Sequence, residues 1–294
     1  FKTTFMEHLP EKYDVQIEEG IEQKVKVLAN NSHQYISTEN LKLMFKLLDL
    51  TSLNTTDTEN DIVEICRKVN GLKETYPDMP NVAAVCFYPP FVKIARNAID
   101  DQSVHIATVG ANFPTSQTFL NVKKAECKEL INHGADEVDI VMPIYKFKEG
   151  KYEEVYEEIK EIKEIVEPKK LKVILETGLL NDYESIQLAS LIAMEAGADF
   201  IKTSTGKSKP AATHDAVYIM AKTVRAFYAK TGKMIGIKPA GGISTAEDAF
   251  AYYSIMYDVL GEHWLNSSLF RIGASRLANE LIAGVYQDET IQYF

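Results

Sequence analysis

Two lysines stand where buried strands should end, and this position could give them unusual chemistry. Lys202 and Lys238 each close a short apolar run and are each followed by a turn that contains glycine. Lysine is rarely buried without a partner, and burial or a neighbouring cation lowers its pKa toward neutrality. A neutral amine is the nucleophile that forms a Schiff base with a carbonyl substrate. The pair therefore predicts carbonyl chemistry, and two solvated lysines at strand ends are the alternative.

Carboxylates occupy similar positions in other predicted strands. Asp139 interrupts the apolar sequence 137–141. Asp49 lies in a further run, and Glu176 ends another. A carboxylate inside an apolar strand is costly unless it is paired, and the lysines are the obvious partners. In one interpretation, Asp139 moves protons while an adjacent lysine forms a covalent adduct. In the other, a buried ion-pair network fills the interior.

Turns that contain glycine follow the last three predicted strands, and they suit an anion. Glycine lets backbone amides approach phosphate oxygens closely, and the helix after each turn presents its positive N-terminal end. Barrel enzymes commonly build phosphate sites from the loops after strands seven and eight. One glycine pair would be weak support, because glycine also serves ordinary tight turns. Three successive turns predict a phosphate site, with candidate residues Gly206, Lys207, Gly241, Gly242, Ser244, Gly273 and Ser275.

The composition limits the class of protein and of partner. The chain has 294 residues, is 46% hydrophobic and carries a net charge of −10. This acidic balance argues against nucleic acid or an anionic membrane as the main partner, so local lysines and amides must attract any anionic substrate. We find no apolar run of the roughly 18 residues that a membrane span needs, and no signal-peptide core. Three cysteines without Cys-x-x-Cys spacing and six scattered histidines predict a cytoplasmic protein with reduced thiols, no metal site and no cofactor.

A short apolar run, a turn and a long amphipathic segment recur along the chain. Runs typical of strands buried in a parallel sheet lie at 45–50, 82–87, 104–109, 137–142, 171–176, 200–203, 235–238 and 270–273. Helical patterns between them include 57–69, 122–133, 152–166, 183–196, 216–230 and 245–260. Eight such units in roughly 250 residues predict a single α/β domain, a (β/α)8 TIM barrel. A doubly wound open sheet is the alternative, although no Gly-x-Gly-x-x-Gly follows the first strand.

The barrel is expected to span residues 41–287, followed by a tail at 288–294. Residues 1–40 precede the first unit and predict a short N-terminal helical extension, packed on the barrel or on a neighbouring subunit. Two kinds of helix boundary are also visible. Gly134 and Gly197 suit helix C-terminal caps, and Ser244 with Glu247 fits a capping box at the start of a helix.

Several segments resemble the signature sequences of one enzyme family, 2-deoxyribose-5-phosphate aldolase. The resemblance covers roughly residues 41–285 in order, through the segments 49–51, 84–89, 137–139, 200–207, 238–242 and 271–275. It implies a metal-free class I aldolase on a (β/α)8 barrel. Such an enzyme reversibly splits 2-deoxy-D-ribose 5-phosphate into glyceraldehyde 3-phosphate and acetaldehyde, in deoxyribose phosphate catabolism.

The resemblance also implies a role for each matching residue. Lys202 matches the Schiff-base lysine, Lys238 the second lysine that keeps the nucleophile's pKa low, and Asp139 the carboxylate that relays protons. Residues that match the contacts to sugar hydroxyls and the proton network are Asp49, Thr51 and Thr205. Residues that match the phosphate cradle are Gly206, Lys207, Gly241, Gly242 and Ser275. The implied partners are small phosphosugars and aldehydes, and the implied assembly is a homo-oligomer, most simply a dimer.

Three positions depart from the family pattern. Ser244 stands where the family often has arginine, and Arg276 where it usually has serine or threonine. We hypothesise that Arg276 supplies the missing charge to the phosphate, while Ser244 caps its helix and offers a hydroxyl or its amide. Some members end in a tyrosine that reaches the active site, and Tyr293 is the candidate here. Two other functions stay open: an aldolase for unphosphorylated or longer aldehydes, and an inactive barrel that senses phosphosugars.

Overall fold

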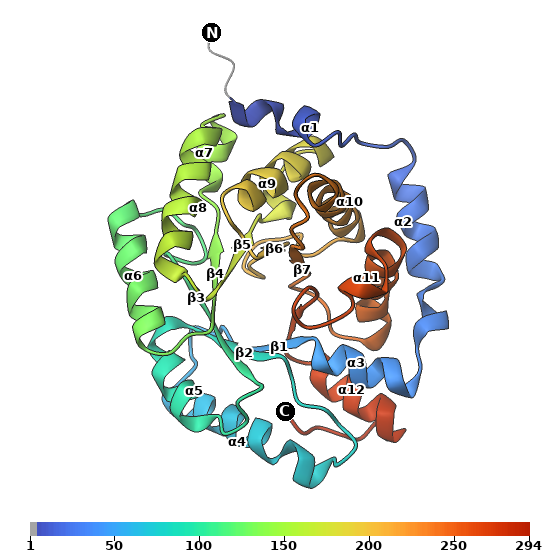
Figure 1. The fold of residues 1–294 in the computed structure, drawn as a ribbon. Helices are drawn as coiled ribbons and strands as arrows, with labels where there is room; N and C mark the ends of the chain where they lie inside the picture. The colour runs from blue at the N-terminus through green and yellow to red at the C-terminus, as the bar shows by residue number, and fades with distance from the viewer. Residues whose placement is uncertain (1–4) are drawn as a thin grey trace.

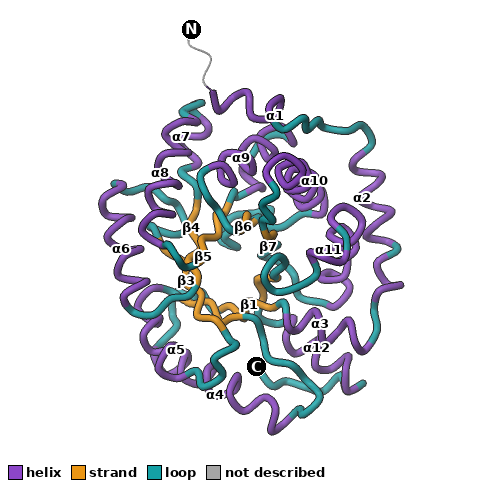
Figure 2. The backbone as a smooth tube through the Cα atoms, in the orientation of Figure 1, coloured by secondary structure: helices purple, strands orange, loops and turns teal. Residues whose placement is uncertain are grey.

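Eight parallel strands form the centre of the molecule. The computed structural model describes residues 5–294. Its strands are β1 (Leu48–Thr51), β2 (Ala84–Phe87), β3 (His105–Gly110), β4 (Glu137–Val141), β5 (Lys170–Ile174), β6 (Phe200–Lys202), β7 (Gly236–Lys238) and β8 (Ile272–Ala274). From β1 to β7 each strand pairs with the next in sequence, and β8 pairs with β1. Two bridges, Ile237 with Phe270 and Ala240 with Gly273, close the ring between the β7 and β8 segments. The predicted (β/α)8 barrel is confirmed (Figures 1 and 2).

Helices surround the strands, because each buries one apolar face against the sheet. In the helix α8 (Tyr152–Val166), for example, Val155, Ile159, Ile162 and Val166 are buried at helical spacing. The helices are α1 (Leu9–Lys12), α2 (Ile21–Asn30), α3 (Thr38–Lys46), α4 (Glu59–Thr75), α5 (Val92–Ala98), α6 (Leu120–Asn132), α7 (Ile144–Lys148), α8 (Tyr152–Val166), α9 (Tyr183–Glu195), α10 (His214–Thr231), α11 (Ala246–Leu260) and α12 (Leu277–Tyr286). Figure 1 shows them as an outer layer around the barrel.

The first predicted strand, 45–50, begins too early. Phe45 belongs to α3, and β1 starts only at Leu48. The side chain of Ser37 caps α3 by accepting a hydrogen bond from the backbone N–H of Asn40 at 3.2 Å. The apolar run therefore ends a helix and then continues into a strand, and hydrophobicity alone cannot divide such a run. Helix α3 also crosses residue 40, where the sequence placed the end of the extension.

The N-terminal segment adds a second layer on one side of the barrel. Helix α1 contacts α9, and α2 contacts α10 and α11. Hydrogen bonds fasten the segment: the Tyr218 hydroxyl donates to Glu18 at 3.2 Å, and the Ser254 hydroxyl donates to the Leu28 carbonyl at 3.0 Å. In Figure 1 this segment runs outside α9, α10 and α11. It therefore covers helices on the flank of the barrel.

The predicted capping box of Ser244 and Glu247 is wrong by one residue. Thr245 caps α11: its hydroxyl accepts the N–H of Asp248 at 3.1 Å, and the Asp248 carboxylate accepts the N–H of Thr245 at 3.1 Å. Both pairs fit the sequence pattern, but the extended backbone that a cap needs occurs at Thr245, with φ −112° and ψ 161°. Because Thr245 is the cap, the hydroxyl of Ser244 is not used for capping.

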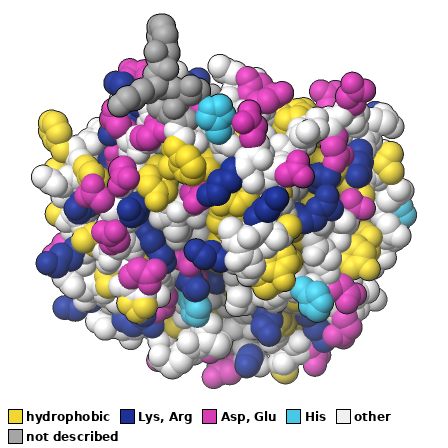
Figure 3. Space-filling view, turned by 45° about the horizontal axis from the view of Figure 1, so that its top comes forward, with side chains coloured by type: hydrophobic (Ala, Val, Ile, Leu, Met, Phe, Trp, Pro, Cys, Tyr) yellow, Lys and Arg dark blue, Asp and Glu magenta, His cyan; other side chains and the backbone are white. Residues whose placement is uncertain are grey.

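The surface carries both signs of charge. Figure 3 shows Lys and Arg side chains interspersed with Asp and Glu side chains across one face of the molecule. Within residues 5–294, no helix is both long enough and apolar enough to cross a membrane. With a net charge of −10, the protein as a whole does not attract an anion, so any attraction must arise locally.

Candidate active site

Lys202 and Lys238 lie side by side at the ends of β6 and β7, where the ladder pairs them directly. Parallel strands in register point paired residues to the same side, so both ammonium groups enter the barrel. Both contact one carboxylate oxygen, Asp139 Oδ2, at 2.9 Å for Lys202 and 2.8 Å for Lys238. All three side chains are buried. The structure therefore brings together the three residues that the sequence predicted as catalytic.

Four further charged side chains lie beneath this group and complete a buried network. Lys172 contacts Asp139 Oδ1 at 2.8 Å and Glu137 Oε2 at 2.6 Å. Arg271 contacts Asp49 Oδ1 and Glu137 Oε1, each at 2.6 Å. A buried carboxylate that has lost water is stable only when cations replace it, and here every carboxylate has at least two. The network that the sequence left as an alternative exists, and it supports the three predicted residues from below.

The two lysines differ in charge environment. Burial lowers the pKa of the Lys202 ammonium, and the Lys238 cation lowers it further, against a partial opposing effect of Asp139. Burial also disfavours the Lys238 ammonium, but Asp139 and Asp49 (2.6 Å away) outweigh it and raise the pKa of Lys238. Burial alone would raise the pKa of Asp139, yet its lysine neighbours hold that pKa well below the usual range. Lys202 is therefore the lysine biased toward the neutral amine.

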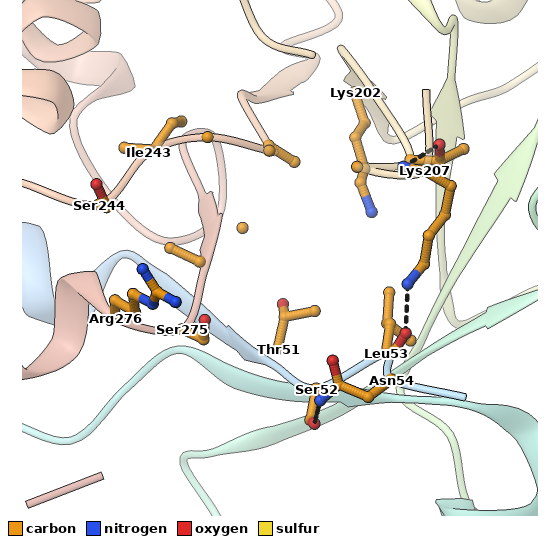
Figure 4. A pocket seen from close by; sticks show the side chains of 17 residues that line it. Thr51, Ser52, Leu53, Asn54, Lys202, Lys207, Ile243, Ser244, Ser275 and Arg276 are labelled. Carbon is orange, nitrogen blue, oxygen red and sulfur yellow. Dashed lines mark hydrogen bonds between the residues drawn. The ribbon is translucent and has the colours of Figure 1, made fainter. Parts of the chain in front are cut away.

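A cavity of about 460 Å³ opens above Lys202. In Figure 4 the ammonium of Lys202 points into this space. The lining residues come from the C-terminal ends of β1, β6 and β8 and from the loops after β1, β6, β7 and β8. They are Thr51, Ser52, Leu53, Asn54, Lys202, Thr205, Gly206, Lys207, Ala240, Gly241, Gly242, Ile243, Ser244, Gly273, Ala274, Ser275 and Arg276. Such loops form the active sites of barrel enzymes. The cavity is large enough to hold a small phosphorylated sugar.

One side of the cavity has the features of an anion site. Figure 4 places Ser244, Ser275 and Arg276 together on this side, away from Lys207. Gly241 and Gly242 have φ of +88° and +77°, which side chains rarely adopt, so the turn there depends on glycine. The N-terminal end of α12 directly follows Arg276, and that of α11 follows Thr245, so both helices add positive potential.

Lys207 lies on the opposite side of the cavity. Its ammonium donates a hydrogen bond to the backbone carbonyl of Leu53, in the loop after β1. Figure 4 shows this contact as a link between two loops at the cavity mouth. Lys207 lines the cavity as the sequence predicted, but in this structure its ammonium holds the loop after β1 in place. Arg276 is the cation on the side of the cavity that carries Ser244 and Ser275, here called the serine side.

Four predicted residues lie outside the lining. Asp139, Lys238 and Asp49 are fully buried in the network below the cavity floor. Asp49 contacts Lys238 and Arg271, each at 2.6 Å, so of its two expected roles this position suits the proton network rather than a contact to a sugar hydroxyl. Tyr293 lies on the outer side of the barrel, where its hydroxyl donates to the carbonyl of Lys68 in α4 at 2.6 Å. The expected tail contribution of Tyr293 is absent from this arrangement.

Sequence reasoning missed Lys172, Glu137 and Arg271 as members of the site. A signal was present, because alternate residues of a strand point to the same side. Glu137 stands two residues before Asp139, and Lys172 pairs with Asp139 across the β4–β5 ladder. Within residues 5–294, no group of three or more His, Cys, Asp or Glu side chains is arranged to hold a metal ion.

The fold and the site together define a class of protein. A (β/α)8 barrel with a buried lysine biased toward the amine form, beside a second lysine and a carboxylate, is an enzyme of the class I aldolase type. The chain belongs to the family described as DeoC/LacD family aldolase, whose model matches residues 43–252.

Two similar proteins and one similar solved structure are named deoxyribose-phosphate aldolases. The chain is 38% identical over 256 residues to the deoxyribose-phosphate aldolase of Homo sapiens, an alignment that covers 84% of this chain and 80% of that protein. Identity to the deoxyribose-phosphate aldolase of Mus musculus is 37%, with the same coverage of 84% and 80%. A tetrameric deoxyribose phosphate aldolase from Aeropyrum pernix, 23% identical, shares the fold with a TM-score of 0.67 over 88% of this chain and 97% of that one.

Proposed function

We propose that this protein catalyses the reversible cleavage of 2-deoxy-D-ribose 5-phosphate to D-glyceraldehyde 3-phosphate and acetaldehyde, with Lys202 as the nucleophile. The unequal surroundings of the two lysines carry the assignment. Lys202 faces the cavity and contacts one carboxylate, whereas Lys238 lies below the floor between two carboxylates. A lysine that must attack a carbonyl needs its free electron pair, and Lys202 has the environment that favours it.

The first stage joins the sugar to Lys202. The amine attacks C1 of the open-chain aldehyde, the carbonyl oxygen takes a proton, and a carbinolamine forms. Loss of the C1 oxygen as water then gives a protonated imine. Asp139 contacts both lysines and is placed to take and return protons, directly or through water. The Lys238 cation opposes a second positive charge on Lys202 before the attack.

The second stage breaks the carbon chain. Removal of the proton from the C3 hydroxyl lets the C2–C3 bond break, and its electron pair moves to the imine, which becomes an enamine. C3 leaves as the aldehyde of glyceraldehyde 3-phosphate. Protonation of the enamine at C2 and hydrolysis of the imine release acetaldehyde and free Lys202. The positive imine nitrogen accepts electrons better than an aldehyde oxygen, which is what the covalent adduct contributes.

The serine side of the cavity is proposed to bind the 5-phosphate. Backbone amides at Gly241 and Gly242, the hydroxyls of Ser244 and Ser275, and the Arg276 guanidinium are its proposed ligands. A cytoplasmic location and a dimeric or larger assembly stay predictions from the sequence.

The decisive test is covalent trapping of the imine. Incubation with acetaldehyde and borohydride should add one ethyl group to Lys202, and peptide mass mapping should find no other lysine labelled to a comparable extent. Lys202→Arg should abolish both labelling and turnover of 2-deoxyribose 5-phosphate, because a guanidinium stays protonated. Lys207→Arg is the matched control and should keep labelling at Lys202. Labelling centred on Lys238, or spread equally over surface lysines, would refute the proposal.

A further inference from the structure

Glu176 is a buried carboxylate that the reaction scheme above does not use. It lies two residues beyond the end of β5 and is only 2% exposed. Its backbone is left-handed, with φ 53° and ψ 57°, a conformation that is uncommon for residues with a side chain. Such a conformation persists where the surroundings impose it, and it occurs often at functional sites. The position of Glu176 therefore needs an explanation beyond ordinary packing.

The side-chain hydrogen bonds of Glu176 both reach one residue of the cavity wall. Its Oε1 accepts the backbone N–H of Thr205 at 3.1 Å, and its Oε2 accepts the hydroxyl of Thr205 at 2.7 Å. The Thr205 oxygen in turn accepts the backbone N–H of Lys207 at 3.0 Å. Thr205 lines the cavity, three residues after Lys202. Glu176 is thus connected to the cavity through Thr205.

These contacts determine what the Thr205 hydroxyl can do. A hydroxyl has one proton to donate and two lone pairs that accept. The proton is directed at the Glu176 carboxylate, and the Lys207 N–H occupies one lone pair. One lone pair remains for a ligand. Thr205 can therefore accept a hydrogen bond from a substrate hydroxyl, but it has no proton left for a carbonyl or phosphate oxygen.

Two close backbone contacts also join the loop after β5 to the loop after β6. The N–H of Thr177 donates to the carbonyl of Thr203 at 2.9 Å. A side chain on Gly178 would lie 2.0 Å from the carbonyl oxygen of Pro210, so the two backbones approach too closely for any other residue. These contacts fix the loop after β5 relative to the loop after β6, and they therefore fix the position of the Glu176 carboxylate relative to Thr205.

We infer that Glu176 is a positioning residue that makes Thr205 an acceptor for a sugar hydroxyl. The inference rests on the proposed function and specifies it further: the hydroxyl is one of those at C3 and C4, between the imine carbon at Lys202 and the phosphate. Glu176 touches no substrate in this scheme. It acts by orienting the proton of Thr205.

Glu176→Gln tests the inference with almost no change in size. The side-chain oxygen of glutamine can still accept the Thr205 N–H, and its NH2 group then faces the Thr205 hydroxyl. Thr205 must accept from that NH2, so its own proton turns toward the cavity and meets the proton of the sugar hydroxyl. We expect kcat/KM for 2-deoxyribose 5-phosphate to fall roughly ten- to a hundredfold, mainly through KM. The rate of labelling of Lys202 by acetaldehyde and borohydride should stay unchanged, because acetaldehyde has no hydroxyl.

Two further variants separate positioning from general damage. Glu158→Gln alters an equally buried carboxylate, 3% exposed, that pairs with Lys123 between α6 and α8, and it should not separate the sugar reaction from labelling. Thr205→Val should reduce the sugar reaction alone, and adding Glu176→Gln to it should cause little further loss. The inference is overturned if Glu176→Gln lowers both reactions equally, lowers neither, or keeps its full effect beside Thr205→Val. Absence of labelling in the unaltered enzyme would instead refute the proposed function.

Discussion

At the scale of single residues, the chemistry depends on a difference between two lysines that the ladder places side by side. Lys238 contacts both Asp49 and Asp139, so its positive charge is stabilised although it is buried. Lys202 shares only Asp139 and lies close to that positive charge. The same burial therefore gives one lysine a raised pKa and the other a lowered pKa. The number of nearby carboxylates decides which lysine can act as the amine.

Lys238→Met should raise the pKa of Lys202, because it removes a neighbouring cation that disfavours the ammonium form. At a given pH a smaller share of Lys202 is then neutral. The midpoint of the pH dependence of acetaldehyde labelling at Lys202 should move upward by on the order of one unit. Lys172→Met is the matched control, since it also frees an oxygen of Asp139 but removes a cation that lies farther down the network. An equal shift in both variants, or none in either, would mean that Lys238 does not tune Lys202.

The catalytic residues could be predicted because their types are rare at their positions. A lysine at the end of an apolar run and an aspartate inside one need a special reason, so Lys202, Lys238 and Asp139 stood out. Arg271 did not, although it falls within the predicted run 270–273, because it reaches Asp49 and Glu137 only through its long side chain. Such reach across the barrel has no periodic signal in the sequence.

At the scale of elements, helices α11 and α12 begin beside the same cavity. Ser244 comes just before the cap of α11, and Arg276 comes directly before α12. The strand-and-helix order was predictable from alternating apolar and amphipathic runs. The choice between Ser244 and Thr245 as the cap was not, because it depends on which backbone is extended where the loop leaves β7. The position of Tyr293 was also unpredictable, since hydrogen bonds from the backbone of residues 293 and 294 to Asn279 place the tail.

Arg276→Ala should lower kcat/KM for 2-deoxyribose 5-phosphate by roughly ten- to a hundredfold, because a charge-assisted hydrogen bond is worth about 1.5–3 kcal/mol. Turnover of free 2-deoxyribose should change little. Steady-state kinetics on the two sugars measure both effects. Arg276→Lys keeps the charge but cannot form a bidentate contact, so its loss of kcat/KM on the phosphorylated sugar should be intermediate. Equal losses of kcat/KM on both sugars, or no loss on either, would show that Arg276 does not bind the phosphate.

At the scale of the whole molecule, stability depends on three carboxylates in the barrel interior. The pKa values of Glu137 and Asp139 are held well below the usual range, and that of Asp49 is lowered, because buried cations outweigh the effect of burial on each. A carboxylate whose pKa is lower in the folded state stabilises that state above its unfolded pKa, near 4. The contribution is lost as the pH falls toward the folded pKa.

We therefore expect the free energy of unfolding to change little between about pH 7 and pH 5 and to fall steeply below about pH 4. Denaturant titrations at a series of pH values measure this dependence. Asp49→Asn removes one of the three titrating groups, so its slope below pH 4 should be shallower by about one proton. Glu39→Gln, which alters an exposed carboxylate on α3 that lies 4.0 Å from the Lys42 ammonium, should leave the slope unchanged. A stability that stays constant down to pH 3 would contradict this account.

The glycines around the cavity fall into two groups that place different demands on the sequence. Gly241 and Gly242 are required by their backbone angles, whereas Gly273 is required by a neighbour. A methyl group at Gly273 would lie 3.0 Å from Cε of Lys238 and 2.9 Å from Cβ of Ala240. The absence of a side chain at Gly273 therefore leaves room for the aliphatic part of Lys238, whose ammonium reaches Asp49 and Asp139. Positions 238 and 273 form one unit of design, and a redesigned barrel that adds a side chain at 273 has to move the lysine as well.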